Sequence, residues 1–299
     1  MHAMKRLTLL VVLAAAAVAS TANAQTTLRY QFKEGDKLQY TIDQKMKMAM
    51  KLMDQNIDTK MNMFMDMTWN VLKVDKDGNA QVQIKVPFVK VTMDGPTGLV
   101  EADSNSKQEL DDPIGKIVTQ MAKAMATMEV SGTMLPTGEI KDAKVSEETL
   151  KALKNLPGAD KMGDMLNSES FKAMVSSIIF PTEAISTGKT WTNKTENKTP
   201  FGKTSTQNTF TYEGTTDKDG ATLQKIAVKP AIKIEADPNA KIKIEIKDAK
   251  GSGTVLFDNK TGRLVESVTN QTTEMQIGAM GLNLSQTIDQ TTTIRLKKK

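Results

Sequence analysis

The amino-acid sequence predicts a mainly β protein (α+β), in which two pseudo-repeats form a curved antiparallel sheet or half-barrel with a few helices between and against them. Three observations lead to this fold class: long stretches in which apolar and polar residues alternate, glycine-containing turn motifs between those stretches, and an internal repeat. Alternation with period two places each apolar set on one face of an extended strand. The sequence has no cysteine, so packing alone must hold the domain together.

The first 24 residues have the pattern of an export signal. A basic start with Lys5 and Arg6 precedes the apolar run LTLLVVLAAAAVA, and the small residues ANA follow it. This is the arrangement of a cleaved secretory signal peptide, residues 1–24. We therefore expect an exported protein, periplasmic or extracellular, in which residues 25–299 form a single compact domain. No later stretch is long and apolar enough to span a bilayer.

The strongest alternation lies in residues 46–69. Methionines recur at every second position on both sides of the polar segment DQNIDT (54–59), which we interpret as the turn of a long antiparallel hairpin. One face of that hairpin would carry a set of thioethers and one indole. The predicted ligand-binding residues are Met46, Met48, Met50, Met61, Met63, Met65, Met67 and Trp69.

The chain repeats itself once, with halves at 28–141 and 184–296. The motif Asp-Lys-Asp-Gly occurs at 75–78 and again at 217–220, and Ser-Gly-Thr occurs late in each half. Two further pairs keep the same order: EGDKLQYT (34–41) with STGKTWTN (186–193), and VKVTMD (89–94) with IKIEAD (232–237). Four matching features in one order predict a duplicated unit. A helical linker at 145–180 joins the two halves.

Each half is predicted to be an antiparallel meander. Glycine supplies the positive φ that tight hairpin turns require, so the Asp-Lys-Asp-Gly motifs are interpreted as turns. The segment AKIKIEIK (240–247) alternates most regularly, with Ile242, Ile244 and Ile246 on one side. Pro87 lacks an N–H and interrupts a strand pattern, which predicts a bulge or a sheet edge.

Three helices are predicted between the strands. Asp112 and Pro113 form a favourable N-cap and first-turn pair, and the apolar stripe typical of a helix packed on a sheet follows. A second helix runs from Ser146 to the stop at Pro157, and a third covers about 160–179. The stripe of the first helix comprises Ile114, Ile117, Val118, Met121 and Met125.

The residue types argue against an enzyme. The only histidine, His2, lies in the signal segment and there is no cysteine, so no Ser–His–Asp triad, cysteine nucleophile or ordinary zinc site is predicted. Adjacent acidic residues, such as Glu147 and Glu148, are expected to cap helices or face solvent. The Asp-Lys-Asp-Gly motifs lack the closing Glu of a calcium loop. We predict no catalytic residues, no metal site and no cofactor.

Charge and composition limit the partners. The formal charge of +5 falls to +3 without Lys5 and Arg6, since the signal segment has no acidic residue, and aromatic residues make up only 4% of the chain. Nucleic-acid binding is therefore not predicted. The outward lysines Lys45, Lys47 and Lys51 could meet an anionic membrane surface. We prefer the interpretation that they are solvated or guard a sheet edge.

The methionine rows leave three interpretations open. Methionine is flexible and polarisable and suits surfaces that accept variable apolar shapes, which favours a groove that binds or carries an apolar small molecule or lipid. A purely structural role, with the rows buried beneath helices in an envelope or interaction protein, is the alternative from another class. Soft thioethers also select Cu(I), so the third interpretation is that the methionines bind copper.

Several turn and strand motifs resemble those of an uncharacterised family of exported bacterial proteins of unknown function. The architecture that they imply is similar to that of the half-barrel carriers that ferry lipoproteins across the periplasm. The family resemblance implies no active residues for this chain. The residues that carry it are Gly35-Asp36-Lys37-Leu38-Gln39-Tyr40, Gly188-Lys189-Thr190-Trp191, Pro200-Phe201-Gly202 and Asp258-Asn259-Lys260-Thr261-Gly262.

Overall fold

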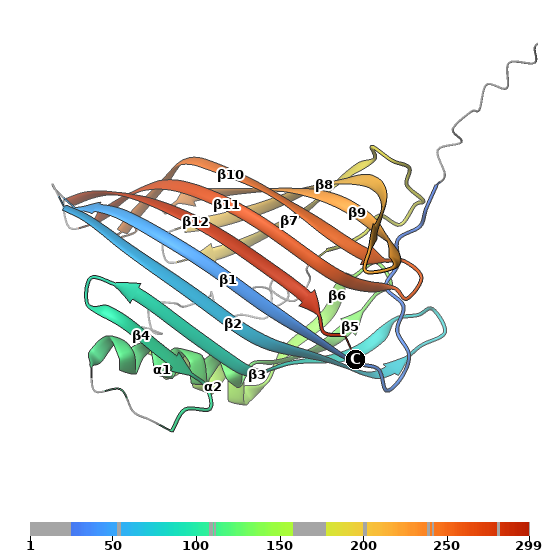
Figure 1. Ribbon diagram of the computed structural model, residues 1–299, viewed down its shortest axis with the longest axis horizontal. Coiled ribbons are helices and arrows are strands. Elements are labelled where there is room, and N and C mark those ends of the chain that lie inside the picture. The colour runs from blue at the N-terminus through green and yellow to red at the C-terminus, as the bar shows by residue number, and fades with distance from the viewer. Residues whose placement is uncertain are drawn as a thin grey trace, which may run out of the picture.

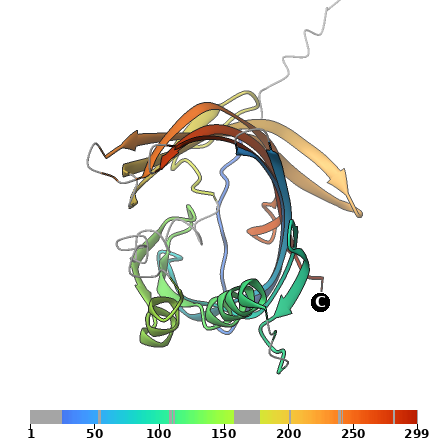
Figure 2. The ribbon, with the colours of Figure 1, turned by 90° about the vertical axis from the view of Figure 1, so that its left-hand side faces the viewer.

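The protein forms one curved, unclosed antiparallel sheet of 12 strands with two helices in the described part of the chain (Figures 1 and 2). The predicted mainly β fold class is therefore confirmed. The predicted signal segment lies outside the described residues. The computed structural model describes residues 25–52, 55–107, 110, 112–157, 178–199, 202–237, 240, 242–279 and 282–298.

The two halves of the chain contribute six strands each. The first six are β1 (Lys37–Leu52), β2 (Gln55–Val74), β3 (Ala80–Gly95), β4 (Gly98–Asp103), β5 (Glu129–Met134) and β6 (Ile140–Val145). The others are β7 (Thr190–Thr199), β8 (Gly202–Lys218), β9 (Ala221–Ala236), β10 (Ile242–Asp258), β11 (Arg263–Ala279) and β12 (Leu282–Leu296). Their order in the sheet is β6-β5-β3-β2-β1-β12-β11-β10-β9-β8-β7, and β4 pairs with β3. The halves thus join through β1 and β12.

The segments matched by sequence lie on corresponding strands. Segments 34–41 and 186–193 lead into β1 and β7. Segments 89–94 and 232–237 lie at the C-terminal ends of β3 and β9. The two Asp-Lys-Asp-Gly motifs connect β2 to β3 and β8 to β9. The duplication itself stays a prediction, but the strand order of the two halves is compatible with it.

Two predicted irregularities have different outcomes. The register pairs Leu52 with Gln55, so the polar segment 54–59, predicted as a turn, belongs almost entirely to β2. The prediction was wrong because a two-residue connection suffices for a hairpin and the polar residues continue the pairing. At Pro87 the predicted bulge is present. Asp66 pairs with Phe88 and Thr68 pairs with Lys85, so two steps along β2 correspond to three steps along β3.

The two helices begin where predicted. They are α1 (Pro113–Ala126) and α2 (Glu147–Lys154), and the side chains of Asp112 and Ser146 accept the N–H three residues ahead, at 2.6 and 3.2 Å. In the α1 stripe Val118 is buried, whereas Ile117 is 48% exposed, so the buried face is narrower than predicted. The third predicted helix, at about 160–179, lies almost entirely outside the described residues.

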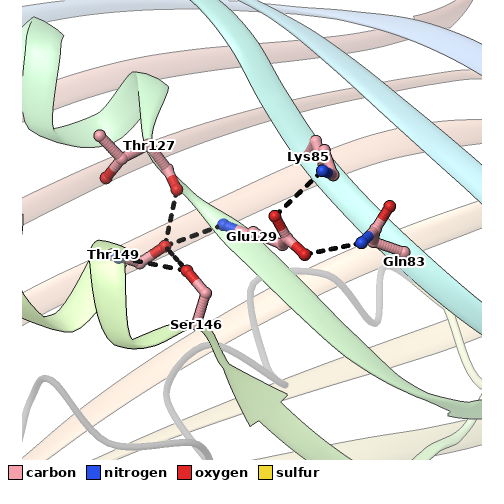
Figure 3. A network of polar contacts seen from close by, with 6 residues as sticks. All are labelled: Gln83, Lys85, Thr127, Glu129, Ser146 and Thr149. Carbon is pink, nitrogen blue, oxygen red and sulfur yellow. Dashed lines mark hydrogen bonds and ion pairs between the residues drawn. The ribbon is translucent and has the colours of Figure 1, made fainter.

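A polar network fixes the helices to the sheet (Figure 3). The hydroxyl of Thr149, a fully buried residue of α2, donates to the carbonyl of Thr127 at 2.7 Å and accepts the N–H of Glu129 at 3.0 Å. The Glu129 carboxylate accepts from Gln83 at 2.6 Å and lies 3.1 Å from the Lys85 ammonium. One glutamate thus links β5 to β3 while its backbone contacts the helix.

The buried core lies toward one end of the curved sheet. The N-terminal segment, blue in Figure 2, crosses the interior there. Its backbone bonds the β5–β6 turn through Tyr30 and the β10–β11 turn through Gln31. We call this the plugged end. The opposite end of the sheet is called the distal end. There β1 ends and β2 begins, β9 ends and β10 begins, and β11 ends and β12 begins.

Candidate ligand-binding face

The eight residues predicted to bind a ligand share the inner face of the sheet, the face that also carries the core. Met46 lies directly opposite Met61, and Met61 lies directly opposite Met93 on the next strand. Directly opposed residues of neighbouring strands project to the same side. Alternation then carries the inner face along β1 and β2 as far as Trp69.

Burial divides the predicted set into three groups. Met65, Met67 and Trp69 are core residues, with exposed fractions of 7%, 8% and 2%. Met61 and Met63 are half-buried and pack against that core. The remaining three, Met46, Met48 and Met50, are half-buried and do not belong to the core cluster. The members nearest the plugged end therefore serve packing, while those near the distal end face the inside of the curve beyond the core.

The apolar inner face extends into strands that the sequence prediction left out. Ile288 of β12 lies directly opposite Met48, and Ile277 of β11 lies opposite Ile244 of β10. The regular alternation of 240–247 was a signal for this face, but it did not reveal which strands are neighbours. We define the distal wall as the half-buried residues Met46, Met48, Met50, Ile57, Ile244, Ile246, Met275, Ile277, Leu284 and Ile288.

A band of polar side chains lies between the core and the distal wall. Gln290 is directly opposite Met46 on one side and Gln271 on the other. Gln271 donates to the hydroxyl of Thr273 at 3.3 Å, and Gln290 donates to the hydroxyl of Thr292 at 3.1 Å. The inner face thus changes from apolar core to amides and hydroxyls and back to apolar residues toward the distal end.

Strands β7 and β8 present a polar inner face. The inner positions that follow Trp191 and Phe210 toward the distal end are Asn193 and Thr195 on β7 and Asn208 and Thr206 on β8. Trp191 and Asn193 both donate to the carbonyl of Ile179, at 2.9 and 3.3 Å. The apolar character of the inner face is therefore confined to part of the sheet, which includes β10, β11 and β12 of the second half.

Aromatic residues close the plugged end. The Tyr30 ring centroid lies 5.4 Å from that of Phe180 and 5.2 Å from that of Phe257, and the two phenylalanine rings are 4.7 Å apart. Arg263 lies over the ring of Phe32 at 5.1 Å and forms an ion pair with Asp36. Since these rings are buried, they serve packing rather than a binding surface.

We consider three hollows that are lined by described residues. The largest, about 880 Å³, lies between β9 and β10 toward the distal end. A second, about 570 Å³, is lined mainly by outward polar residues such as Lys45, Lys60 and Asp289, with Met46 at its edge. A third, about 600 Å³, lies near Asp36 and Arg263. None of them follows the methionine rows along their length.

Shifted pKa values occur mainly in surface ion pairs. Hydrogen bonds from Lys194 and Lys203 lower the pKa of Glu196 to about 2. Burial raises the pKa of Glu266, but hydrogen bonds from Lys218 and Arg295, both at 2.7 Å, outweigh it and leave that pKa lowered. Among the described residues, no cluster of three or more His, Cys, Asp or Glu side chains could hold a metal ion.

Several solved structures resemble the fold. One is a lipovitellin chain from a structure of lipid–protein interactions, with 9% identity and a TM-score of 0.48, covering 90% of this chain and 26% of that one. This chain thus spans about a quarter of that protein.

Two bacterial structures match over most of both chains. A DUF1329 family protein from Desulfovibrio piger ATCC 29098 has 9% identity and a TM-score of 0.15, with 86% and 85% of the two chains covered. A domain described as that of an outer membrane lipoprotein-sorting protein, from Vibrio parahaemolyticus, has 11% identity and a TM-score of 0.16, with 87% and 86% covered.

Sequence comparison places the chain in a family. No curated protein matches it. A family model described as "Family of unknown function (DUF6263)" matches residues 77–264, which is more than half of the chain. The chain therefore belongs to the DUF6263 family, whose function is unknown.

Proposed function

We propose that this protein is an exported, non-enzymatic binding or carrier protein that holds an apolar ligand, such as a lipid acyl chain, against its distal wall. The observation that carries the proposal is the recurrence of half-buried apolar side chains near the distal end of β2, β1, β12, β11 and β10, interrupted on β12 by Gln286, which lies opposite Met50 and Met275. The ten side chains of the wall are half-buried rather than packed into the core. An acyl chain is the ligand whose shape and polarity suit a long apolar strip.

The expected affinity is moderate. Each methylene moved from water to an apolar contact contributes about 0.8 kcal/mol, so about fourteen methylenes contribute roughly 11 kcal/mol. Association opposes this by about 4 kcal/mol or more. The remaining 7 kcal/mol or less corresponds to a Kd on the order of 10 µM or weaker. A carrier that must release its ligand would work in this range.

The polar band suggests how such a ligand would be oriented. Gln271 and Gln290 lie at the border of the distal wall and offer both donors and acceptors. A lipid whose chain contacts Met48 and Ile288 could direct its polar group toward these amides. Methionine suits the chain end of the site because its unbranched side chain adapts to different apolar shapes.

The location and the absence of catalysis belong to the same proposal. The signal pattern of residues 1–24 supports export. In the described ranges, no helix is long and apolar enough to cross a membrane. The lack of histidine and cysteine after residue 24 supports a non-enzymatic role.

The test compares two adjacent positions of one strand. Met48 belongs to the distal wall, whereas Ala49 is exposed on the other face. With palmitic acid as the probe, isothermal titration of Met48→Lys should show at least tenfold weaker binding, because the ammonium would be buried against the chain. Ala49→Lys should bind like the wild type. Equal affinity of both variants, or no binding by the folded wild type, would refute the proposal.

Copper is a second candidate because of one observation. Met46, Met61 and Met93 lie directly opposite one another on three consecutive strands, and adjacent strands are about 4.8 Å apart. Three flexible thioethers in a row could converge on one Cu(I) ion, which soft sulfur ligands select.

Leucine at the middle methionine separates the two candidates. Met61→Leu keeps an apolar side chain of similar volume but removes a sulfur ligand. A competition titration with a Cu(I) chelator should show lost copper affinity in this variant if copper is the ligand, with palmitate binding unchanged. A wild-type chain that binds neither probe would leave only the structural role.

A further inference from the structure

We infer that the methionines of the distal wall are a modification site, at which a peroxide oxidises the thioethers to sulfoxides while the core methionines stay reduced. The oxidation turns an apolar surface into a polar one. Its consequence for ligand release rests on the proposed function, whereas the modification itself needs no ligand. The four residues of the site are Met46, Met48, Met50 and Met275.

Thioethers are the only sulfur groups of this chain. It contains 20 methionines and no cysteine, so a peroxide that reaches the protein meets no thiol. In the oxidation, the thioether sulfur attacks one oxygen of hydrogen peroxide, so that an S–O bond forms and the O–O bond breaks. The sulfur loses two electrons, the peroxide gains them, and its second oxygen leaves as water. The product, methionine sulfoxide, is a polar side chain that dedicated reductases return to the thioether.

Burial separates the distal-wall methionines from those of the core. Met65 and Met67 are 7% and 8% exposed, so their side chains lie inside the packed core. The four methionines of the distal wall are half-buried and do not belong to the core cluster. Hydrogen peroxide should therefore reach the distal wall first. An intermediate group is half-buried but packs against the core, and it comprises Met61, Met63 and Met93.

Each methionine of the distal wall has a hydrogen-bond donor directly opposite on a neighbouring strand. Directly opposed residues have Cβ atoms about 4.5–5.5 Å apart and project to the same side, so their side chains are close enough to form a hydrogen bond. The donors are two glutamine amides and one threonine hydroxyl. The pairs are Met46 with Gln290, Met48 with Thr59, Met50 with Gln286 and Met275 with Gln286.

These donors suit the oxidised side chain better than the reduced one. A thioether sulfur is a weak acceptor, whereas the oxygen of a sulfoxide is polar and accepts hydrogen bonds. In the core, Met65 lies opposite Ile42 and Val89, which have no side-chain donor. A sulfoxide at Met65 would therefore be a buried acceptor without a side-chain partner. The distal wall can take up the modification without loss of the fold, and the core cannot.

The modified side chains are those that would contact the acyl chain in the proposed function. A sulfoxide in that contact would have to exchange its hydration for apolar surroundings, and burial of a polar group without a hydrogen bond is unfavourable. Oxidation should therefore release the ligand, and reduction should restore the apolar wall.

Site-resolved mass spectrometry during treatment of the folded protein with hydrogen peroxide tests the modification. Cleavage before aspartate releases Met67 as the only methionine of residues 66–74, and tandem spectra separate the other sites. The distal-wall methionines should be oxidised at least tenfold faster than Met67, and Met61 and Met63 should react at intermediate rates. Equal rates at Met48 and Met67, or a loss of the folded state as fast as Met48 reacts, would overturn the inference.

The role of the opposed donors is tested by two glutamine variants. Gln286→Leu removes the amide between Met50 and Met275, and Gln276→Leu on the exposed outer face of β11 is the matched control. Oxidation should lower the urea midpoint of Gln286→Leu at least twice as much as that of the wild type or of Gln276→Leu. Equal shifts in all three proteins would contradict the accommodation of sulfoxides by the wall.

Isothermal titration with palmitic acid tests the consequence for binding. The oxidised wild type should bind at least tenfold more weakly than the reduced wild type. A variant that combines leucine at all four positions keeps the wall apolar, and its affinity should stay within twofold after the same treatment. Equal weakening in both proteins would place the responsible group elsewhere and overturn the release. If the reduced wild type bound no palmitate, the proposed function would fail, and the oxidation rates and urea midpoints would still decide the inference.

Discussion

Removal of one ring from the plugged end should destabilise the whole domain. Phe257 is 0% exposed and lies 4.7 Å from Phe180 and 5.2 Å from Tyr30, centroid to centroid. Truncation of a buried phenylalanine to alanine typically costs about 3–5 kcal/mol, which includes two aromatic pairs of about 0.5–1.5 kcal/mol each. Phe257→Leu fills most of the volume but loses both aromatic pairs, so it should lower the free energy of unfolding by about 1–3 kcal/mol.

Urea unfolding followed by tryptophan fluorescence measures both losses. With a slope near 3 kcal/mol per molar urea, Phe257→Ala should lower the midpoint by about 1–1.7 M. Leu99, which is 69% exposed, supplies the control: Leu99→Ala should change the free energy of unfolding by about 0.5 kcal/mol or less.

A small effect would refute the reasoning about the plug. If Phe257→Ala lost less than about 1 kcal/mol, the N-terminal segment could not be docked across the sheet as described. A double-mutant cycle between Phe257→Leu and Tyr30→Leu gives a second criterion, because the edge-to-face pair should appear as a coupling of about 0.5–1.5 kcal/mol.

Three further predictions concern polar groups and backbone strain. Glu266→Gln should lower the free energy of unfolding by about 0.5–1 kcal/mol at pH 7 in chemical denaturation. Because the pKa of Glu266 is lowered in the folded state, the difference from the wild type should shrink as the pH falls through and below about 4. A difference that stays constant with pH would contradict the ion pairing. Tyr40→Phe should leave the Tm unchanged or raise it, since the buried hydroxyl has no hydrogen-bond partner in the described residues, whereas a loss above about 1 kcal/mol would show that it has one. Gly262→Ala should lower the Tm more than Gly220→Ala. Both glycines have positive φ, but only at Gly262 would an added Cβ meet the N-terminal segment, 2.3 Å from the backbone nitrogen of Gln31. Equal losses of Tm in the two variants would contradict that contact.

Much of the fold could be predicted from local patterns. The helix starts followed from Asp112 and Ser146, and the bulge at Pro87 followed from its missing N–H. The turn at 54–59 was mispredicted because polar residues also occupy exposed ends of long strands, and polarity alone does not distinguish the two. The plug residues Tyr30 and Phe32 were not predicted, since a short irregular segment has no periodicity to interpret.

The candidate site depended on information that a single strand does not contain. Periodicity showed that Met46, Met48 and Met50 share a face, but only the register shows that Ile288 of β12 lies opposite Met48. The burial gradient along β2, from half-buried Met61 to buried Trp69, likewise depends on where the core ends. Pairing between distant segments therefore decides which predicted residues form core and which form a surface.

The polar inner face of β7 and β8 bears on why the distal wall is apolar. The sheet contains strands of 15 to 20 residues, longer than the usual 3–10, and the core fills mainly the half near the plugged end. Near the distal end, β7 and β8 direct Asn and Thr side chains inward, so this architecture tolerates polar residues there. Fold stability alone thus does not require methionine and isoleucine at the same depth on β1, β10, β11 and β12. The half-buried apolar side chains on those strands are the ones that the proposed ligand would cover, so the proposal accounts for this difference between the strands.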